Sequence, residues 1–387
     1  MLFVDDEDGV RAGLRTALRK LRREFDFHYA ASGPEALEIL ASEPVDLIVS
    51  DMRMPGMTGA ELLHRVRDEH PTVVRYVLSG EAEEALVLQA MPVVHRWLSK
   101  PCDRERLTEA IADALRYRDL LLDPDLASAV VAATTLPSPP ARYTEMLDLL
   151  GDPEVDLVDV AAVAERDPAL AAKVLQLANS AFAAPQAVAD IRSAVARIGI
   201  SAVTHLALSA ELVRALEPSE SVPGFDVVAL ERHVTAVGAT ASQLALPEDR
   251  LVAGAAGLLS HIGLLLEASL VPDRLRASYD TALADSCTLL GAERGRFGVG
   301  HPELAGHLLS IWGLPTRIVL AVAGGHDHPP ADAAPPFDAR DAVRAARLVV
   351  ESDDGAESSA PYLDEVPEDL ALAVAHWRHL ARSGDLR

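Results

Sequence analysis

The chain of 387 residues is 49% hydrophobic but only 4% aromatic, which predicts two or three domains with cores of alanine, leucine and valine. Its 59 acidic and 35 basic residues give a net charge of −24, which argues against a DNA-binding output, since such a domain brings a basic stripe. Cys102 and Cys287 are too few for a disulfide framework and, with no signal peptide before the first apolar run, favour a cytoplasmic location.

Four apolar runs in the first hundred residues predict strands, and polar residues follow each run. The runs are residues 2–4, 45–49, 76–78 and 97–98, and the polar residues after them are Asp5, Asp6, Asp51, Ser79 and Lys100. In an open parallel sheet, ligands bind outside the carboxyl ends of the strands. These five side chains are therefore expected to converge at one edge of a sheet.

The residue types in this group indicate phosphate chemistry. Three carboxylates at close range repel one another unless a cation lies among them, and oxygen-only ligands of this kind suit Mg²⁺. A carboxylate can also act as a nucleophile and form an aspartyl-phosphate. Lys100 would supply positive charge for the phosphoryl oxygens, and Ser79 would supply a hydroxyl donor.

This region resembles the receiver domain of two-component response regulators, over residues 1 to 120. The resemblance is carried by residues 3–7, the loop 51–59, Ser79-Gly80 and Lys100-Pro101, in the family's order. It implies a flavodoxin-like α/β fold with a five-stranded parallel sheet. It also implies that Asp51 accepts a phosphoryl group from a histidine kinase.

The same resemblance assigns roles to the other pocket residues. Mg²⁺ would be held by Asp5, Asp6 and Asp51 together with the backbone carbonyl of Arg53. Ser79 and Lys100 would contact the phosphoryl oxygens. Trp97 stands where the family often carries an aromatic side chain that swings inward on activation.

Proline residues mark the end of this first region. The sequence Leu136-Pro137-Ser138-Pro139-Pro140 blocks helix continuation, and no later segment alternates as a strand does. We therefore predict a receiver domain over residues 1–122, a helical connector over 123–134, an all-α domain over 135–330 and a helical tail over 331–387.

One stretch of the helical region has the length of a membrane span, from Leu251 to Val271. A histidine and a glutamate near its middle, His261 and Glu267, are costly in lipid. Glycines at positions 254, 257 and 263 suggest close helix packing. A buried core helix is predicted here, and no membrane partner.

Residues 135–330 resemble the HDOD domain, an all-helical relative of the HD-type metal phosphohydrolases whose members serve mostly as signalling and protein-interaction outputs. The motifs that carry the resemblance are Leu136-Pro137, Asp167-Pro168-Ala169-Leu170, Leu177-Ala178-Asn179-Ser180-Ala181-Phe182, Ala194-Val195-Ala196-Arg197-Ile198-Gly199, Gly257-Leu258-Leu259, Ile262-Gly263, Gly300-His301-Pro302-Glu303, Trp312-Gly313-Leu314-Pro315 and His326.

The catalytic doublet of an HD enzyme is missing from this copy. Aligned on the flanking glycines and leucines, the His-Asp positions hold Ser260 and His261. Serine is a poor ligand and the bridging carboxylate is absent, so a degenerate, non-catalytic module is predicted. An alternative stays open, in which the receiver gates a metal-dependent phosphohydrolase with a rearranged site drawn from His233, His261, His301 or His326.

The sequence therefore predicts a phosphorylation-dependent response regulator that is not an enzyme. Its expected partners are a histidine kinase, an unknown downstream protein and a second copy of the chain in a homodimer, with Mg²⁺ as cofactor and no nucleic acid. Two further alternatives are a transcription regulator, which the charge disfavours, and a receiver that dimerises without phosphorylation, which the complete pocket disfavours.

Overall fold

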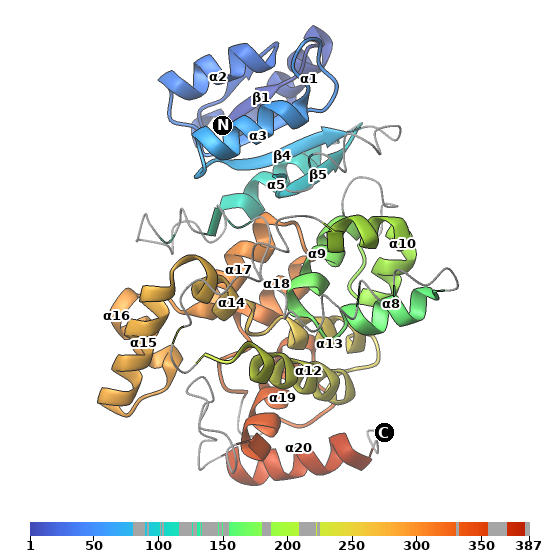
Figure 1. Cartoon of the computed structure of the whole chain (residues 1–387), viewed down its shortest axis with the longest axis vertical. Helices are drawn as coiled ribbons and strands as arrows, with labels where there is room; N and C mark the ends of the chain where they lie inside the picture. The colour runs from blue at the N-terminus through green and yellow to red at the C-terminus, as the bar shows by residue number, and fades with distance from the viewer. Residues whose placement is uncertain are drawn as a thin grey trace. The chain divides into compact units, whose positions relative to one another are not determined.

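The computed structural model describes residues 1–79, 90, 93–100, 102, 104–115, 126, 130, 131, 133, 146, 149, 155–179, 187–208, 222, 225–329, 333–354 and 370–383. The chain forms two compact units, one made mainly of residues 1–134 and the other mainly of residues 135–387. Figure 1 colours the first unit from blue to cyan and the second from green to red.

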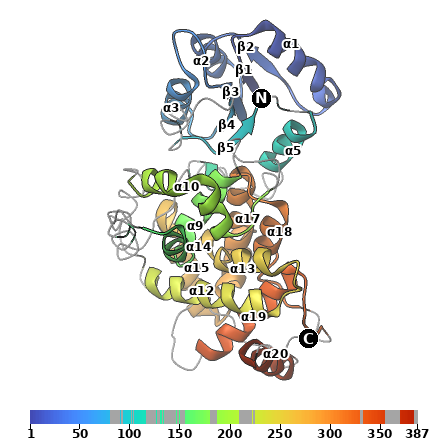
Figure 2. The same ribbon diagram turned by 90° about the vertical axis from the view of Figure 1, so that its right-hand side faces the viewer.

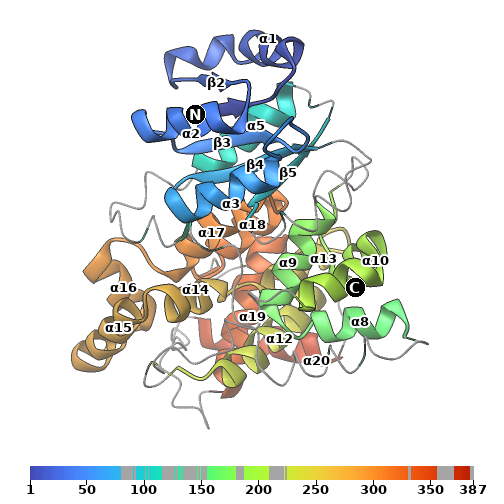
Figure 3. The ribbon, with the colours of Figure 1, turned by 45° about the horizontal axis from the view of Figure 1, so that its top comes forward.

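The first unit is built on a five-stranded parallel sheet with the spatial order β2-β1-β3-β4-β5. Figure 2 labels all five strands, and Figure 3 shows β2, β3, β4 and β5 from another side. The strands are β1 (Leu2–Val4), β2 (His28–Ala30), β3 (Leu47–Asp51), β4 (Val74–Ser79) and β5 (Arg96–Ser99). The predicted flavodoxin-like fold is confirmed. The strand order reverses between β1 and β3, so the crevice for ligands is expected outside the carboxyl ends of these two strands.

Helices cover both faces of this sheet (Figure 2): α1 (Asp8–Ala17) and α5 (Arg104–Leu115) lie on one face, and α2 (Gly33–Ser42) and α3 (Gly59–Glu69) on the other. A short 3₁₀ helix, η1 (Arg19–Arg23), follows α1. Side-chain caps set where α2 and α3 begin. Ser32 accepts a hydrogen bond from the Glu35 amide at 3.4 Å, and Thr58 with Glu61 forms a complete capping box.

The second unit is helical throughout its described residues, apart from an isolated bridge between Ala245 and Phe337. Its helices are α8 (Leu157–Ala164), α9 (Pro168–Ala178), α10 (Ile191–Leu208), α12 (Val227–Leu244), α13 (Arg250–Leu258), α14 (Ile262–Leu270), α15 (Pro272–Asp285), α16 (Leu289–Phe297), α17 (His301–Ile311), α18 (Thr316–Ala323), α19 (Ala339–Asp354) and α20 (Ala371–Ser383). The predicted all-α class is confirmed. α12 packs against α13 and α19, and α19 packs against α20, so the C-terminal helices belong to this unit.

The apolar stretch over residues 250–270 is long and apolar enough to cross a membrane, but 83% of an 18-residue window within it is buried inside the protein. The prediction of one continuous core helix there was wrong in one respect. α13 ends at Leu258 and α14 begins at Ile262, because Leu259 and His261 leave helical geometry with ψ angles of 0° and 19°. Ser260 and His261 therefore lie in a turn between two helices.

Two glycines fix the packing on either side of this turn. A Cβ atom on Gly257 would lie 2.7 Å from the Cα of Gly238, so α13 approaches α12 backbone to backbone. A Cβ atom on Gly263 would lie 2.0 Å from the carbonyl oxygen of His301, so the start of α14 lies directly against the start of α17. The predicted close packing of the glycines is confirmed for both positions.

Each unit carries one of the two cysteines of the chain. Cys102 follows β5 and is half-buried, whereas Cys287 lies exposed between α15 and α16. Neither cysteine forms a disulfide.

Gly59→Ala tests the close approach of α3 to β3. The new Cβ atom would lie 2.1 Å from the carbonyl oxygen of Asp51, so we expect the receiver unit to lose about 1–3 kcal/mol of unfolding free energy. Urea unfolding followed by circular dichroism measures this loss. The matched control is Gly13→Ala on α1, which meets no atom within 4 Å and should stabilise the helix by about 0.5–1 kcal/mol. Equal effects of the two changes would contradict the packing argument.

Candidate functional site

Three carboxylates meet at the carboxyl edge of the sheet. Asp5 follows β1 and Asp51 is the last residue of β3, so the two side chains flank the point where the strand order reverses. Ligand oxygens of Asp5, Asp6 and Asp51 all lie within 4.8 Å of one another. Asp5 and Asp51 are 0% and 6% exposed, whereas Asp6 faces solvent.

Lys100 joins the two buried carboxylates. It follows β5, and its Nζ atom lies 2.9 Å from Oδ2 of Asp5 and 2.6 Å from Oδ1 of Asp51. Burial disfavours the charged amine, but the hydrogen bonds to Asp51 and Asp5 outweigh it and raise the pKa of Lys100. Burial raises the pKa of Asp51 above its usual value, against the opposing effect of Lys100.

The arrangement fits a magnesium ion. Three carboxylates and one ammonium leave two uncompensated negative charges when all are ionised, and the donors are oxygens, which Mg²⁺ prefers. The structure thus brings together Asp5, Asp6, Asp51 and Lys100, as the sequence predicted.

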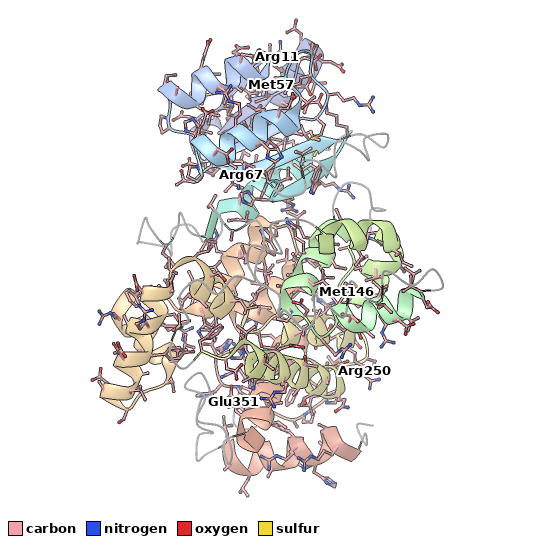
Figure 4. The ribbon with its side chains drawn as sticks, in the orientation of Figure 1. Arg11, Met57, Arg67, Met146, Arg250 and Glu351 are labelled. Carbon is pink, nitrogen blue, oxygen red and sulfur yellow. The ribbon has the colours of Figure 1, made fainter. Side chains whose placement is uncertain are left out.

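Backbone contacts hold the two loops that carry these carboxylates. Arg11 of α1 donates a hydrogen bond to the carbonyl oxygen of Asp5, and the amide of Glu7 donates to Oδ1 of Asp5 at 2.9 Å. In the β3–α3 loop, the amide of Gly59 donates to the carbonyl of Met52 at 2.9 Å. Figure 4 labels Arg11 of α1 and Met57 of the β3–α3 loop. The sequence did not indicate Arg11, because a single arginine in the first turn of a helix gives no signal of its own.

The remaining predicted residues of this pocket lie at its edges. Arg53 is exposed in the β3–α3 loop, two residues after Asp51. Trp97 lies within β5 opposite Val77 of β4 and is 4% exposed. Ser79 ends β4, and its side chain is outside the described residues, as is Pro101. The roles assigned to these residues stay predictions.

The opposite end of β5 is anchored by a buried histidine that the sequence analysis did not single out. Nδ1 of His95 accepts a hydrogen bond from the amide of Arg75 at 2.9 Å, which places the proton of the neutral ring on Nε2. That nitrogen lies 2.7 Å from the carbonyl oxygen of Val131, in the connector. One residue further along, Arg96 forms an ion pair of 2.9 Å with Asp113 of α5.

In the helical unit, four histidines gather in the interior. His233 lies on α12, His261 caps α14, His301 begins α17 and His326 follows α18, and their exposed fractions are 3%, 0%, 1% and 6%. The ring centroid of His326 lies 4.7 Å from those of His261 and His301. Burial, followed by the neighbouring histidines and Arg347, lowers the pKa of His261 and His326 well below the usual value.

Ser260 and His261, the positions of the missing doublet, are thus inside this cluster. Oγ of Ser260 lies 3.0 Å from Nδ1 of His261, and both residues are fully buried. The sequence suggested four histidines for an alternative, rearranged metal site, and the structure places all four in one cluster: His233, His261, His301 and His326.

A pair of buried carboxylates adjoins the histidines. Oε2 of Glu293 accepts hydrogen bonds from the amide of His301 at 2.9 Å and from its Nδ1 at 2.8 Å. Glu267 accepts from Nε of Arg274 at 2.7 Å. Burial and then the charge of Glu293 raise the pKa of Glu267 to about 8, so at neutral pH this side chain holds a proton.

Comparison with known proteins identifies both units. Residues 1–112 match the family model of the response regulator receiver domain, and residues 136–328 match that of the HDOD domain. The chain is 38% identical over 123 residues to the sensor kinase CckA of Brucella abortus, a match that covers 31% of this chain and 13% of CckA. It is 34% identical over 143 residues to the response regulator protein PilR of Pseudomonas aeruginosa, which covers 36% of this chain and 31% of PilR.

A solved structure is also similar, that of the MmoQ response regulator from Methylococcus capsulatus. It is 25% identical, with a TM-score of 0.47, and the match covers 62% of this chain and 98% of that one. The chain therefore matches almost all of the solved MmoQ structure but less than a third of CckA or PilR.

Glu267→Gln tests the proton held in the helical unit. The folded carboxyl has a pKa of about 8 against 4.5 for the free group, so between these values only the folded chain binds the proton. The wild type should lose stability relative to the variant as the pH rises through this window, by at most about 1.4 kcal/mol per pH unit, and the difference should level off above it. Urea unfolding from pH 5 to 9 measures it.

The control for this change is Glu165→Gln, a partly exposed carboxylate that pairs with Arg192 on the same unit. We expect the unfolding free energy of Glu165→Gln to change with pH in the same way as that of the wild type between pH 5 and 9. A Glu267→Gln variant whose stability also runs parallel to the wild type would contradict the assigned proton.

Proposed function

Because the chain is a two-component response regulator that joins a receiver domain to an HDOD domain, we propose that Asp51 is its phosphoacceptor and that a histidine kinase supplies the phosphoryl group. The observation that carries this proposal is the position of Lys100, whose Nζ atom lies 2.6 Å from Asp51 and 2.9 Å from Asp5. The ammonium group of Lys100, which already bridges two buried carboxylates, can also pair with the oxygens of an incoming phosphoryl group.

The chemistry follows from these residues. An oxygen of Asp51 attacks the phosphorus, the bond from phosphorus to the kinase histidine breaks, and the histidine leaves as a neutral imidazole after taking up a proton. Lys100 transfers a hydrogen bond from the carboxylate of Asp51 to a phosphoryl oxygen. Asp5, Asp6 and Asp51, with the carbonyl of Arg53, would hold Mg²⁺, which offsets the charge of the phosphoryl oxygens.

Strand β5 offers a route from this site to the connector. Lys100 follows its carboxyl end, and His95 precedes its amino end with the contact of 2.7 Å to Val131. A change in the hydrogen bonds of Lys100 therefore acts on a strand whose other end contacts the connector. Ser79 and Trp97 are the further residues that we expect to move on phosphorylation, which would bias a two-state surface.

For the helical unit we propose a protein-interaction output that does not hydrolyse phosphoesters. His261 stands at the Asp position of the doublet and offers no carboxylate to bridge two metal ions, which supports this role. The downstream protein is expected to bind in the cytoplasm, the chain is expected to dimerise, and the net charge of −24 disfavours nucleic acid.

Phosphodonor labelling tests the receiver. With acetyl phosphate and Mg²⁺, the wild type should gain one phosphoryl group per chain that is stable to acid and labile to base, because an acyl phosphate forms on Asp51. Asp51→Asn should abolish the gain, and chelation of Mg²⁺ should prevent it. Intact-mass spectrometry measures the added phosphoryl group.

Asp46→Asn is the matched control, an aspartate one residue before β3 at the opposite end of the strand. It should be labelled like the wild type. Labelling that persists in Asp51→Asn at the wild-type level would refute the assignment of the acceptor.

His95→Phe tests the route through β5. A phenyl ring fills the same space but leaves the Arg75 amide and the Val131 carbonyl without this partner, which costs about 1–3 kcal/mol of unfolding free energy. We expect faster amide hydrogen exchange over residues 126–133 and loss of the change in exchange that phosphorylation causes there. Labelling of Asp51 should persist, since the acceptor lies at the other end of the sheet.

The matched control here is His64→Phe on α3, which is half-buried. In His64→Phe, amide hydrogen exchange over residues 126–133 should be the same as in the wild type. Unchanged exchange over residues 126–133 in His95→Phe would rule out this route without touching the assignment of Asp51.

A further inference from the structure

The histidine cluster of the helical unit holds three imidazole nitrogens at the spacing of metal ligands. Nε2 of His326 lies 3.1 Å from Nε2 of His301 and 3.3 Å from Nε2 of His261. Two imidazole nitrogens bound to one Zn²⁺ at 2.0–2.1 Å in tetrahedral geometry lie about 3.3–3.4 Å apart. Ligand atoms of all three residues fall within 4.8 Å of one another.

Hydrogen bonding alone does not account for this spacing. An imidazole nitrogen has a single in-plane position, which either carries a proton or accepts one. Nε2 of His326 can therefore form a hydrogen bond with His301 or with His261, but it lies close to both. Nδ1 of His326 is buried and has no hydrogen-bond partner within the described part of the chain. A buried polar group in this state calls for an unseen water or ion.

The groups around the cluster favour a metal ion at its centre. Glu293 accepts a hydrogen bond from Nδ1 of His301 at 2.8 Å, which directs the lone pair of Nε2 inward, as in carboxylate–histidine–metal triads. Ser260 lies 3.0 Å from Nδ1 of His261 and can orient that ring in the same way. The nearby positive charge of Arg347 is paired with Glu351 at 2.8 Å, and both side chains are fully buried.

We propose that His261, His301 and His326 bind one first-row transition metal ion of the class that imidazole nitrogens prefer, represented by Zn²⁺. This site is separate from the oxygen-rich pocket of the receiver and does not depend on the phosphoacceptor role of Asp51. It joins the turn before α14, the start of α17 and the turn after α18. The ion is a structural clamp of the interaction module.

The metal content of the purified full-length protein tests this proposal. Protein expressed in zinc-supplemented medium should carry about one ion per chain, measured by inductively coupled plasma mass spectrometry, because three imidazoles complete most of a tetrahedral shell. Protein expressed with Co²⁺ should show the intense visible absorption of a tetrahedral nitrogen site. Asp51→Asn should keep both signals, which separates this ion from any in the receiver pocket.

Three variants test the assignment of the ligands and of the residue that positions them. His326→Ala should lose the ion, whereas His328→Ala, an exposed histidine two residues away, should keep it. Glu293→Gln removes a positioning carboxylate and should weaken Zn²⁺ affinity by about 10–100-fold while the cobalt spectrum keeps its shape. Wild-type protein that is metal-free after expression with Zn²⁺, and whose thermal midpoint does not move when Zn²⁺ is added, would overturn the proposal in favour of a buried water.

Discussion

The ammonium group of Lys100, shared between the carboxylates of Asp5 and Asp51, is the interaction on which the receiver site depends. Two carboxylates at exposures of 0% and 6% would repel each other strongly without it. Its position is set by the sheet, because Lys100 follows β5 while the two aspartates follow β1 and end β3. The site is therefore a product of strand register, and each partner comes from a different part of the chain.

In the helical unit, repulsion between buried charges is limited because several of the buried titratable groups are neutral. Its interior holds histidines, a protonated glutamate and a paired arginine, so that little net charge is buried. The packing that assembles them depends on backbone contact, since Gly263 brings α14 against the carbonyl of His301. The turn at Ser260 and His261 then directs both side chains inward. The histidine cluster therefore depends on the precise relative positions of three segments, which are the turn before α14, the start of α17 and the turn after α18.

The sequence predicted most of the receiver because its signals are local. Apolar runs ended at Asp5, Asp51 and Lys100, and parallel topology alone brings such ends together. Strand β2 was not singled out, since His28-Tyr29-Ala30 is too short to stand out as an apolar run. In the helical unit, Asp167 of the Asp167-Pro168 motif precedes α9 and accepts hydrogen bonds from the amides of Ala169 and Leu170 at 3.0 and 3.1 Å, a local signal that the sequence also carries.

What the sequence could not predict depends on tertiary contacts. The break between α13 and α14 follows from packing against α12 and α17, because residues 251–271 by themselves are typical of one helix. The convergence of His233, His261, His301 and His326 likewise required the fold, since up to 65 residues separate the neighbouring rings. His95 and Val131 are 36 residues apart, and no periodicity connects them.

The two cysteines have a practical consequence. One cysteine outside any disulfide lies in each unit, Cys102 two residues after Lys100 and Cys287 on the surface between α15 and α16. The natural sequence thus already contains a pair of attachment points for spin labels or fluorophores, without any engineered residue. A distance measured between labels at the two cysteines, with and without a phosphodonor, would report whether chemistry at Asp51, the proposed phosphoacceptor, reaches the helical unit.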